Sequence, residues 1–235
     1  MTCLSAFGQS KFGEPEDSAN FKIELNPDFF LLGTFSDYMG RFRYVDREKQ
    51  IDRYYPYEEP LAIYIAQFIN KHYGLAVDPV FEASRHSDIF SPKLANEIHT
   101  KYFDQNGNFI DSTLDSEVKK YSYLTGVYYR YGEHLVDNIY QIKVVNSPKD
   151  KEIYQILKDL KCDRSVYKFM RGYIPSSSIF YFEATPRIIK YFNLIRKEKD
   201  ELQESYSGIY LGEELKVMYS ETQKELIKNL QLIFK

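Results

Sequence analysis

Residues 121–145 read YSYLTGVYYRYGEHLVDNIYQIKVV, and this stretch decides the expected fold. Its first part, 121–131, places aromatic and β-branched residues at a period of two, which is typical of a half-buried strand. The polar segment 132–138 separates it from a second apolar run, 139–145. We therefore expect two antiparallel strands joined as a hairpin.

Helix starts and a second pair of strands follow this hairpin. Ser147 and Asp150 form an S-x-x-D capping box around Pro148, and Thr185-Pro186 repeats the cap-then-proline pattern. Between these two helix starts, 165–173 and 179–182 read as strands. The sequence thus predicts an α+β fold, in which a largely antiparallel four-stranded sheet (about 121–184) has helices on one side.

The N-terminal half is expected to be rich in helices, because proline follows a possible start residue several times. The expected helices span 26–42, 59–73, 79–89 and 92–103, with a loop at 46–57. We expect 21–235 to form a single α+β domain, with a possible boundary near residue 115. The strand order cannot be derived from the sequence.

Composition excludes several classes of protein. The net charge is −3, from 31 basic and 34 acidic residues that are well mixed, so the basic surface that attracts nucleic acid is missing. No apolar run approaches the roughly 20 residues of a membrane span. Two cysteines form no disulfide framework. No motif for a cofactor is present, and we expect none.

The first residues, MTCLSAFGQ, resemble the end of a secretory signal peptide with a small-x-small cleavage site. This pattern predicts export from a bacterium, to the periplasm or outside the cell. The alternative is a short disordered leader on a cytoplasmic protein. In both interpretations 1–20 is a leader and linker.

The missing catalytic signatures favour a non-enzymatic binding or accessory protein. The chain has 22 tyrosines and no tryptophan, and exposed tyrosine is well suited to recognition. The expected binding surface consists of Tyr123, Tyr129, Tyr131 and Tyr181. Its partner would be a protein, a peptide or a saccharide. The amphipathic segment 212–234 is a second possible docking element. Packing in half-buried strands explains the same tyrosines without recognition.

A small hydrolase is the competing hypothesis. Glu82, Arg85 and His86 would share one face of a helix over 79–89, where Glu82 could orient His86 as a general base. Cys162 could act as a nucleophile with a histidine. Its expected place at a helix C-terminus argues against this role, because the helix dipole there favours the neutral thiol.

Residues 104–115 resemble a calcium loop of the D-x-[DN]-x-[DN]-G type, with Asp104, Asn106 and Asn108 at the first ligand positions. The glycine needed at the sixth position is Phe109, and Asp115 replaces the bidentate glutamate. Asn106-Gly107 is also a strong turn signal. We therefore expect a turn here and no metal site.

Overall fold

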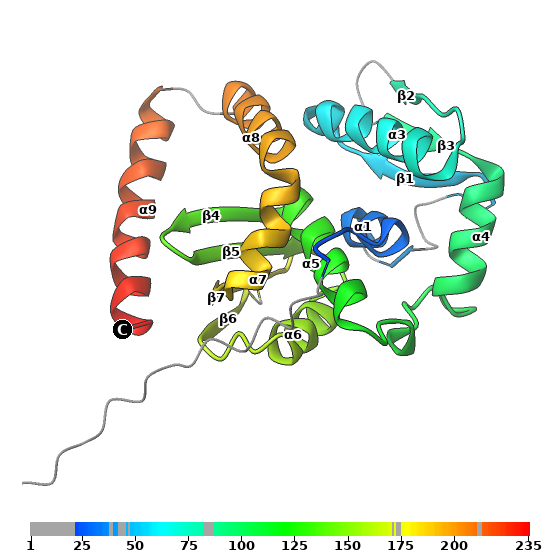
Figure 1. The fold of residues 1–235 in the computed structure, drawn as a ribbon. Coiled ribbons are helices and arrows are strands. Elements are labelled where there is room, and N and C mark those ends of the chain that lie inside the picture. The colour runs from blue at the N-terminus through cyan, green and yellow to red at the C-terminus, as the bar shows by residue number, and fades with distance from the viewer. Residues whose placement is uncertain are drawn as a thin grey trace, which may run out of the picture.

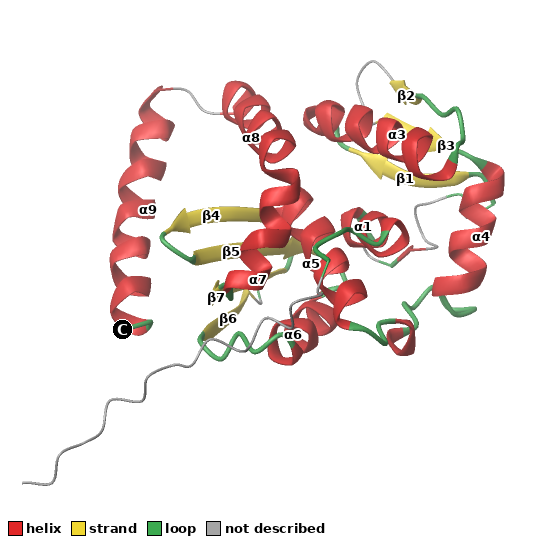
Figure 2. Ribbon diagram, viewed as in Figure 1, coloured by secondary structure: helices red, strands yellow, loops and turns green. Residues whose placement is uncertain are grey.

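The computed structural model shows an α+β protein with two antiparallel sheets (Figures 1 and 2). The structure describes residues 22–37, 40–41, 46, 48–81, 87–170, 172, 175–210 and 213–235, without the side chains of 206–219. None of the helices in these ranges is long and apolar enough to cross a bilayer. The expected leader at 1–20 lies outside the described residues.

The four-stranded sheet lies in the second half of the chain, which confirms the predicted fold class. Its strands are β4 (Gly132–Val136), β5 (Ile139–Val145), β6 (Ser165–Met170) and β7 (Ser177–Glu183). They lie in the order β4-β5-β7-β6, and all neighbouring pairs are antiparallel. Because successive side chains point to opposite faces, Ile142 and Phe180 share one face and Ile139 and Tyr181 share the other.

The segment 121–131 is a helix and not a strand. The strand was predicted because aromatic and β-branched residues occupy every second position, and this prediction is wrong. Helix α5 (Glu117–Tyr131) begins at Ser116, whose hydroxyl accepts a hydrogen bond from the first turn. Its middle is buried on every side, so no amphipathic period is visible in the sequence. The buried hydroxyls of Ser122 and Thr125 donate hydrogen bonds to backbone carbonyls one turn earlier in the helix. Burial therefore overrides the strand preference of the tyrosines.

Helix α1 (Pro27–Thr34) crosses α5 at the centre of the molecule (Figure 1). A Cβ atom added to Gly126 would meet the carbonyl oxygen of Phe30, and one added to Gly33 would meet the backbone of α5. Only glycine therefore allows the two backbones to touch at this crossing. One continuous hydrophobic cluster, spanning residues 29–202, surrounds the contact.

The N-terminal half contains a small three-stranded sheet in addition to its helices. Its strands are β1 (Gln50–Tyr54), β2 (Pro79–Phe81) and β3 (Ser87–Phe90), in the antiparallel order β1-β3-β2. The expected helix over 79–89 and the expected loop over 46–57 are therefore wrong. The helix expected over 26–42 ends at Thr34, because Phe35 is extended. Pro79 is the first residue of an edge strand, a position at which proline is tolerated in sheets. Helices α3 (Glu59–Tyr73) and α4 (Pro92–Tyr102) confirm two of the predicted proline starts.

Helices lie on both faces of the four-stranded sheet, which corrects the prediction of helices on one side. The remaining helices are α6 (Asp150–Asp159), α7 (Pro186–Phe192), α8 (Arg196–Tyr210) and α9 (Glu213–Ile233), with 3-10 turns at Pro56–Glu58, Asp111–Thr113 and Asn193–Ile195. Side chains of α5, α6 and α7 pack against the face that carries Ile142. Terminal helix α9 packs through Leu230 and Phe234 on the opposite face, against Ile139 and Tyr181 (Figure 1).

Candidate functional site

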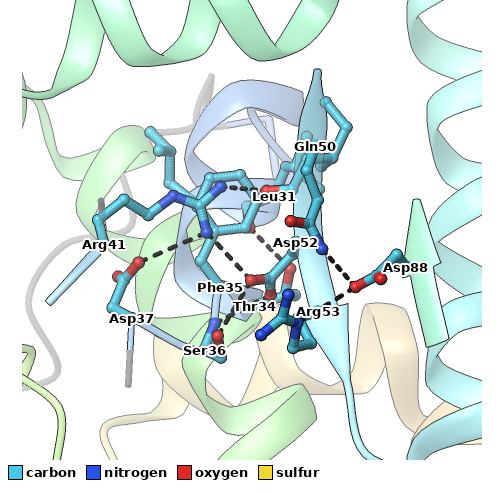
Figure 3. Close-up of polar contacts among 12 residues, drawn as sticks. Leu31, Thr34, Phe35, Ser36, Asp37, Arg41, Gln50, Asp52, Arg53 and Asp88 are labelled. Atoms are coloured by element: carbon cyan, nitrogen blue, oxygen red, sulfur yellow. Dashed lines mark hydrogen bonds and ion pairs between the residues drawn. The ribbon is translucent and has the colours of Figure 1, made fainter. Parts of the chain in front are cut away.

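A buried network of charged side chains joins the segment after α1 to β1 (Figure 3). Arg130 extends this network to α5. Asp52 of β1 is 0% exposed and lies at its centre. One of its carboxylate oxygens accepts from the Ser36 N–H (2.9 Å) and from Arg130 Nη1 (2.7 Å). Its other oxygen accepts from Arg41 Nη1 (3.0 Å). Bonds between ionised groups of this kind are the strong ones in proteins.

The network continues on both sides of Asp52. Arg130 binds Glu58 in a bidentate pair, with Nε–Oε1 at 2.8 Å and Nη2–Oε2 at 2.6 Å. Lys149 Nζ lies 2.9 Å from a carboxylate oxygen of Asp37. The cations Arg41, Arg130 and Lys149 balance the anions Asp37, Asp52 and Glu58, so these six side chains have no net charge.

The ion pairs of this network link the two halves of the chain. Because its charges balance, the network has a structural role. All six side chains are at least nine-tenths buried, where an unpaired charge would be costly. Neither pocket described for this structure is lined by any of them. A ligand that entered here would have to displace ion pairs that are already formed.

A second group of polar residues lies at the surface and surrounds a pocket of about 310 Å³, near the lower limit for small-ligand sites. We call it the serine pocket. It is lined by Val144, Asn146, Ser147, Asp150, Phe169, Ser176, Ser177 and Ser178. These residues come from the ends of β5, β6 and β7 and from the start of α6. Antiparallel pairing of the strands brings them together.

Asp150 is the one charged group among the described residues that line the serine pocket. Its Oδ2 accepts from the hydroxyl of Ser178 (3.2 Å) and lies 3.4 Å from the hydroxyl of Tyr167. No side chain in the described part of the chain bonds to its Oδ1. On the opposite wall, Ser176 donates to the side-chain oxygen of Asn146 (2.9 Å). The pocket therefore presents hydroxyls, an amide and one carboxylate oxygen that can still accept a hydrogen bond.

Aromatic side chains stand beside these polar groups. Phe169 lines the serine pocket and is 50% exposed, and Tyr167, two residues earlier on β6, is 47% exposed. Both side chains lie on the sheet face that carries Ser178. An apolar ring beside fixed hydrogen-bonding groups can bind a ligand that has both an apolar face and hydroxyls.

The four tyrosines expected to form a recognition surface do not form an exposed patch. Tyr123 and Tyr129 are each 1% exposed on α5, and Tyr181 is 7% exposed under α9. Tyr131 is half-buried and donates to the carbonyl oxygen of Phe35 (3.1 Å). Burial raises the pKa of Tyr123 well above 10, so its phenol stays neutral. This prediction was wrong because 121–131 is a core helix and because α9 covers Tyr181 on β7.

Of the residues named in the hydrolase hypothesis, the structure describes Cys162 alone. Cys162 lies just after α6 and is 4% exposed. Burial raises the pKa of its thiol to about 12, so the nucleophilic thiolate is not formed at neutral pH. Glu82, Arg85 and His86 lie outside the described residues, and their role stays a prediction.

The segment that resembles a calcium loop forms the expected turn. Asp104 Oδ1 accepts from the backbone N–H groups of Asn106 and Asn108, both at 2.8 Å, and Oδ2 accepts from the Asn108 amide. These bonds, led by the one from the Asn108 side chain, lower the pKa of Asp104. Gly107 takes the left-handed conformation. No group of three or more His, Cys, Asp or Glu in the described ranges could hold a metal ion.

The sequence analysis does not predict the serine pocket, although the sequence contains the residues that form it. The run Ser176-Ser-Ser178 is typical of a break between strands, and Asp150 of a capping box. That capping box does not form, because α6 begins at Asp150 with Lys149 as its N-cap. Only the pairing of β7 with β5 and β6 brings the two segments together. Arg130, a charge inside a run of aromatic residues, was the corresponding signal for the buried network.

Comparison with known proteins adds no homologue to these observations. The chain matches no protein-family model. It also has no significant sequence match among curated proteins. The candidate sites therefore have to be judged on their geometry.

Proposed function

We propose that this protein is a non-enzymatic binding protein whose serine pocket takes a saccharide. The observation that carries the proposal is a polar pocket with an exposed aromatic ring at its wall. A sugar ring has an apolar C–H face that can pack on Phe169. Its hydroxyls can donate to Asp150 Oδ1 and exchange hydrogen bonds with the serine hydroxyls.

Charge supports a neutral ligand. The start of α6 faces the serine pocket, and a helix N-terminus attracts anions. Asp150 occupies this position with its own carboxylate and opposes a second negative charge. No Lys or Arg among the described residues lines the pocket to bind a phosphate or a carboxylate. A polyhydroxylated neutral molecule fits these groups better than an ionic one.

Isothermal titration calorimetry with glucose, maltose, cellobiose and chitobiose tests the proposal. We expect binding of at least one of them, and at least roughly tenfold weaker binding by Phe169→Ala or Asp150→Asn, because each removes a central contact. Tyr154→Ala is the matched control, since Tyr154 is a 54% exposed aromatic residue on α6 that does not line the serine pocket. Absence of heat with all four sugars, or equal affinity of the pocket variants and the wild type, would refute the proposal.

A further inference from the structure

Strand β6 is an edge strand whose outer backbone groups have no partner in the described structure. The N–H of Glu183 donates to the carbonyl of Arg164 (3.0 Å). This bond shows which residues of β6 direct their backbone groups toward β7 and which direct them outward. In an antiparallel pair, every second residue points its N–H and C=O away from its neighbour. On β6 these residues are Ser165, Tyr167 and Phe169. No hydrogen bond from a described residue reaches their outer backbone groups.

Within the part of the chain that the structure describes, the edge lacks the features that usually prevent pairing with another chain. Proteins protect edge strands with proline, with a bulge, with several charges or with a covering element. Residues 165–170 contain no proline, and their pairing with β7 runs without a bulge. Lys168 is the one charged residue of the strand. Tyr167 and Phe169, on the face opposite Lys168, are about half exposed.

We propose that β6 pairs with β6 of a second copy of this chain. The two strands run antiparallel about a two-fold axis at Tyr167, so two four-stranded sheets join into one. Ser165 of one copy then lies opposite Phe169 of the other, and Tyr167 lies opposite itself. The outward groups of these residues form about six backbone hydrogen bonds, two for each directly opposed pair.

Charge repulsion favours this register over the registers that are shifted by two residues. With Tyr167 on the axis, Lys168 faces Val166 of the second copy, and no like charges are directly opposed. A shift of two residues in one direction places Lys168 opposite Lys168. The same shift in the other direction places it opposite Arg164. Like charges directly opposite each other destabilise a sheet, so both shifted registers are disfavoured.

The aromatic residues support the same arrangement. Opposed residues of an antiparallel pair point to the same face, so Tyr167 and Phe169 of both copies form one continuous strip. Aromatic cross-strand pairs are among the most favourable in sheets. The two serine pockets would open on this same face, although the pairing does not rest on saccharide binding.

Cysteine cross-linking in the full chain tests the register, with Cys3→Ser as background and Cys162 buried. We expect Tyr167→Cys to form a disulfide-linked dimer on mild oxidation, because the two Cα atoms would lie about 5.5 Å apart. Ser165→Cys is the matched control. Its two copies would be roughly 14 Å apart and should not cross-link, whereas mixing it with Phe169→Cys should give a heterodimer.

Sedimentation velocity provides the second measurement. We expect the wild type to dimerise and Tyr167→Lys to be a folded monomer with the circular dichroism spectrum of the wild type, because two like charges would meet on the axis. Tyr154→Lys, an exposed change on α6, should remain dimeric. A monomeric wild type at its highest soluble concentration would overturn the proposal, and so would equal cross-linking at 165 and 167.

Discussion

Replacing Lys199 by methionine should stabilise the protein at neutral pH and destabilise it at pH 10. Lys199 lies on α8 and is 3% exposed, and its Nζ donates to the carbonyl of Tyr129 in the last turn of α5 (2.9 Å). Burial lowers its pKa from 10.5 to about 7, which the charges of Glu133 and Asp200 only partly offset. Methionine keeps the apolar stem and removes the ionisable group.

The size and sign of the effect follow from proton linkage. Between pH 7 and 10.5 the unfolded chain binds more protons at Lys199 than the folded one, so stability rises with pH in this window. The cost of the buried amine is about 4 kcal/mol at pH 7 and about 1 kcal/mol at pH 10. Losing the bond to Tyr129 costs about 2 kcal/mol at either pH. Lys199→Met is therefore stabilised by about 2 kcal/mol at pH 7 and destabilised by about 1 kcal/mol at pH 10.

Urea denaturation at both pH values measures this difference. Tyrosine ionisation in the unfolded chain affects wild type and variant equally and cancels in the comparison. Lys197→Met is the matched control, since the Lys197 side chain is 84% exposed, and its stability should stay close to that of the wild type. If Lys199→Met changes stability equally at pH 7 and pH 10, the assignment of a buried lysine with a lowered pKa is wrong.

Three further changes test the packing and the buried network. Gly126→Ala forces the α1–α5 backbones apart and should cost at least about 2 kcal/mol in thermal or urea unfolding, despite the higher helix propensity of alanine. Asp52→Asn leaves the buried cations in excess and should cost about 3–5 kcal/mol, whereas the exposed control Asp115→Asn should be neutral. Leu230→Ala should speed hydrogen exchange throughout α9 while β5 keeps its protection, and Leu232→Ala, 60% exposed, should change neither.

Local signals predicted the parts of the fold that are determined locally. Prolines 60, 92 and 186 mark helix starts in the structure, because proline at the first helical position needs no hydrogen-bond partner. The strand 139–145 was visible as a short apolar run bounded by polar residues. These elements were sufficient for the α+β class.

The remaining elements depend on contacts between distant parts of the chain. Helix α5 is surrounded by other elements, so its sequence carries no helical period. Strand β1 is short and is completed by β3, which lies far along the chain. The two candidate sites have the same origin, because Arg130 reaches Asp52 across 78 residues and Asp150 meets Ser178 across 28. No local pattern specifies such pairs.

The glycine contact between α1 and α5 also restricts how this sequence can diverge. A surface side chain can be exchanged freely, but Gly33 and Gly126 have no substitute unless both helices move. Arg130 follows Gly126 by one helical turn and binds the carbonyl of Thr34, next to Gly33. A remote homologue should therefore retain two glycines and one arginine in this spatial relation, even after its overall identity has fallen below the level that sequence searches detect.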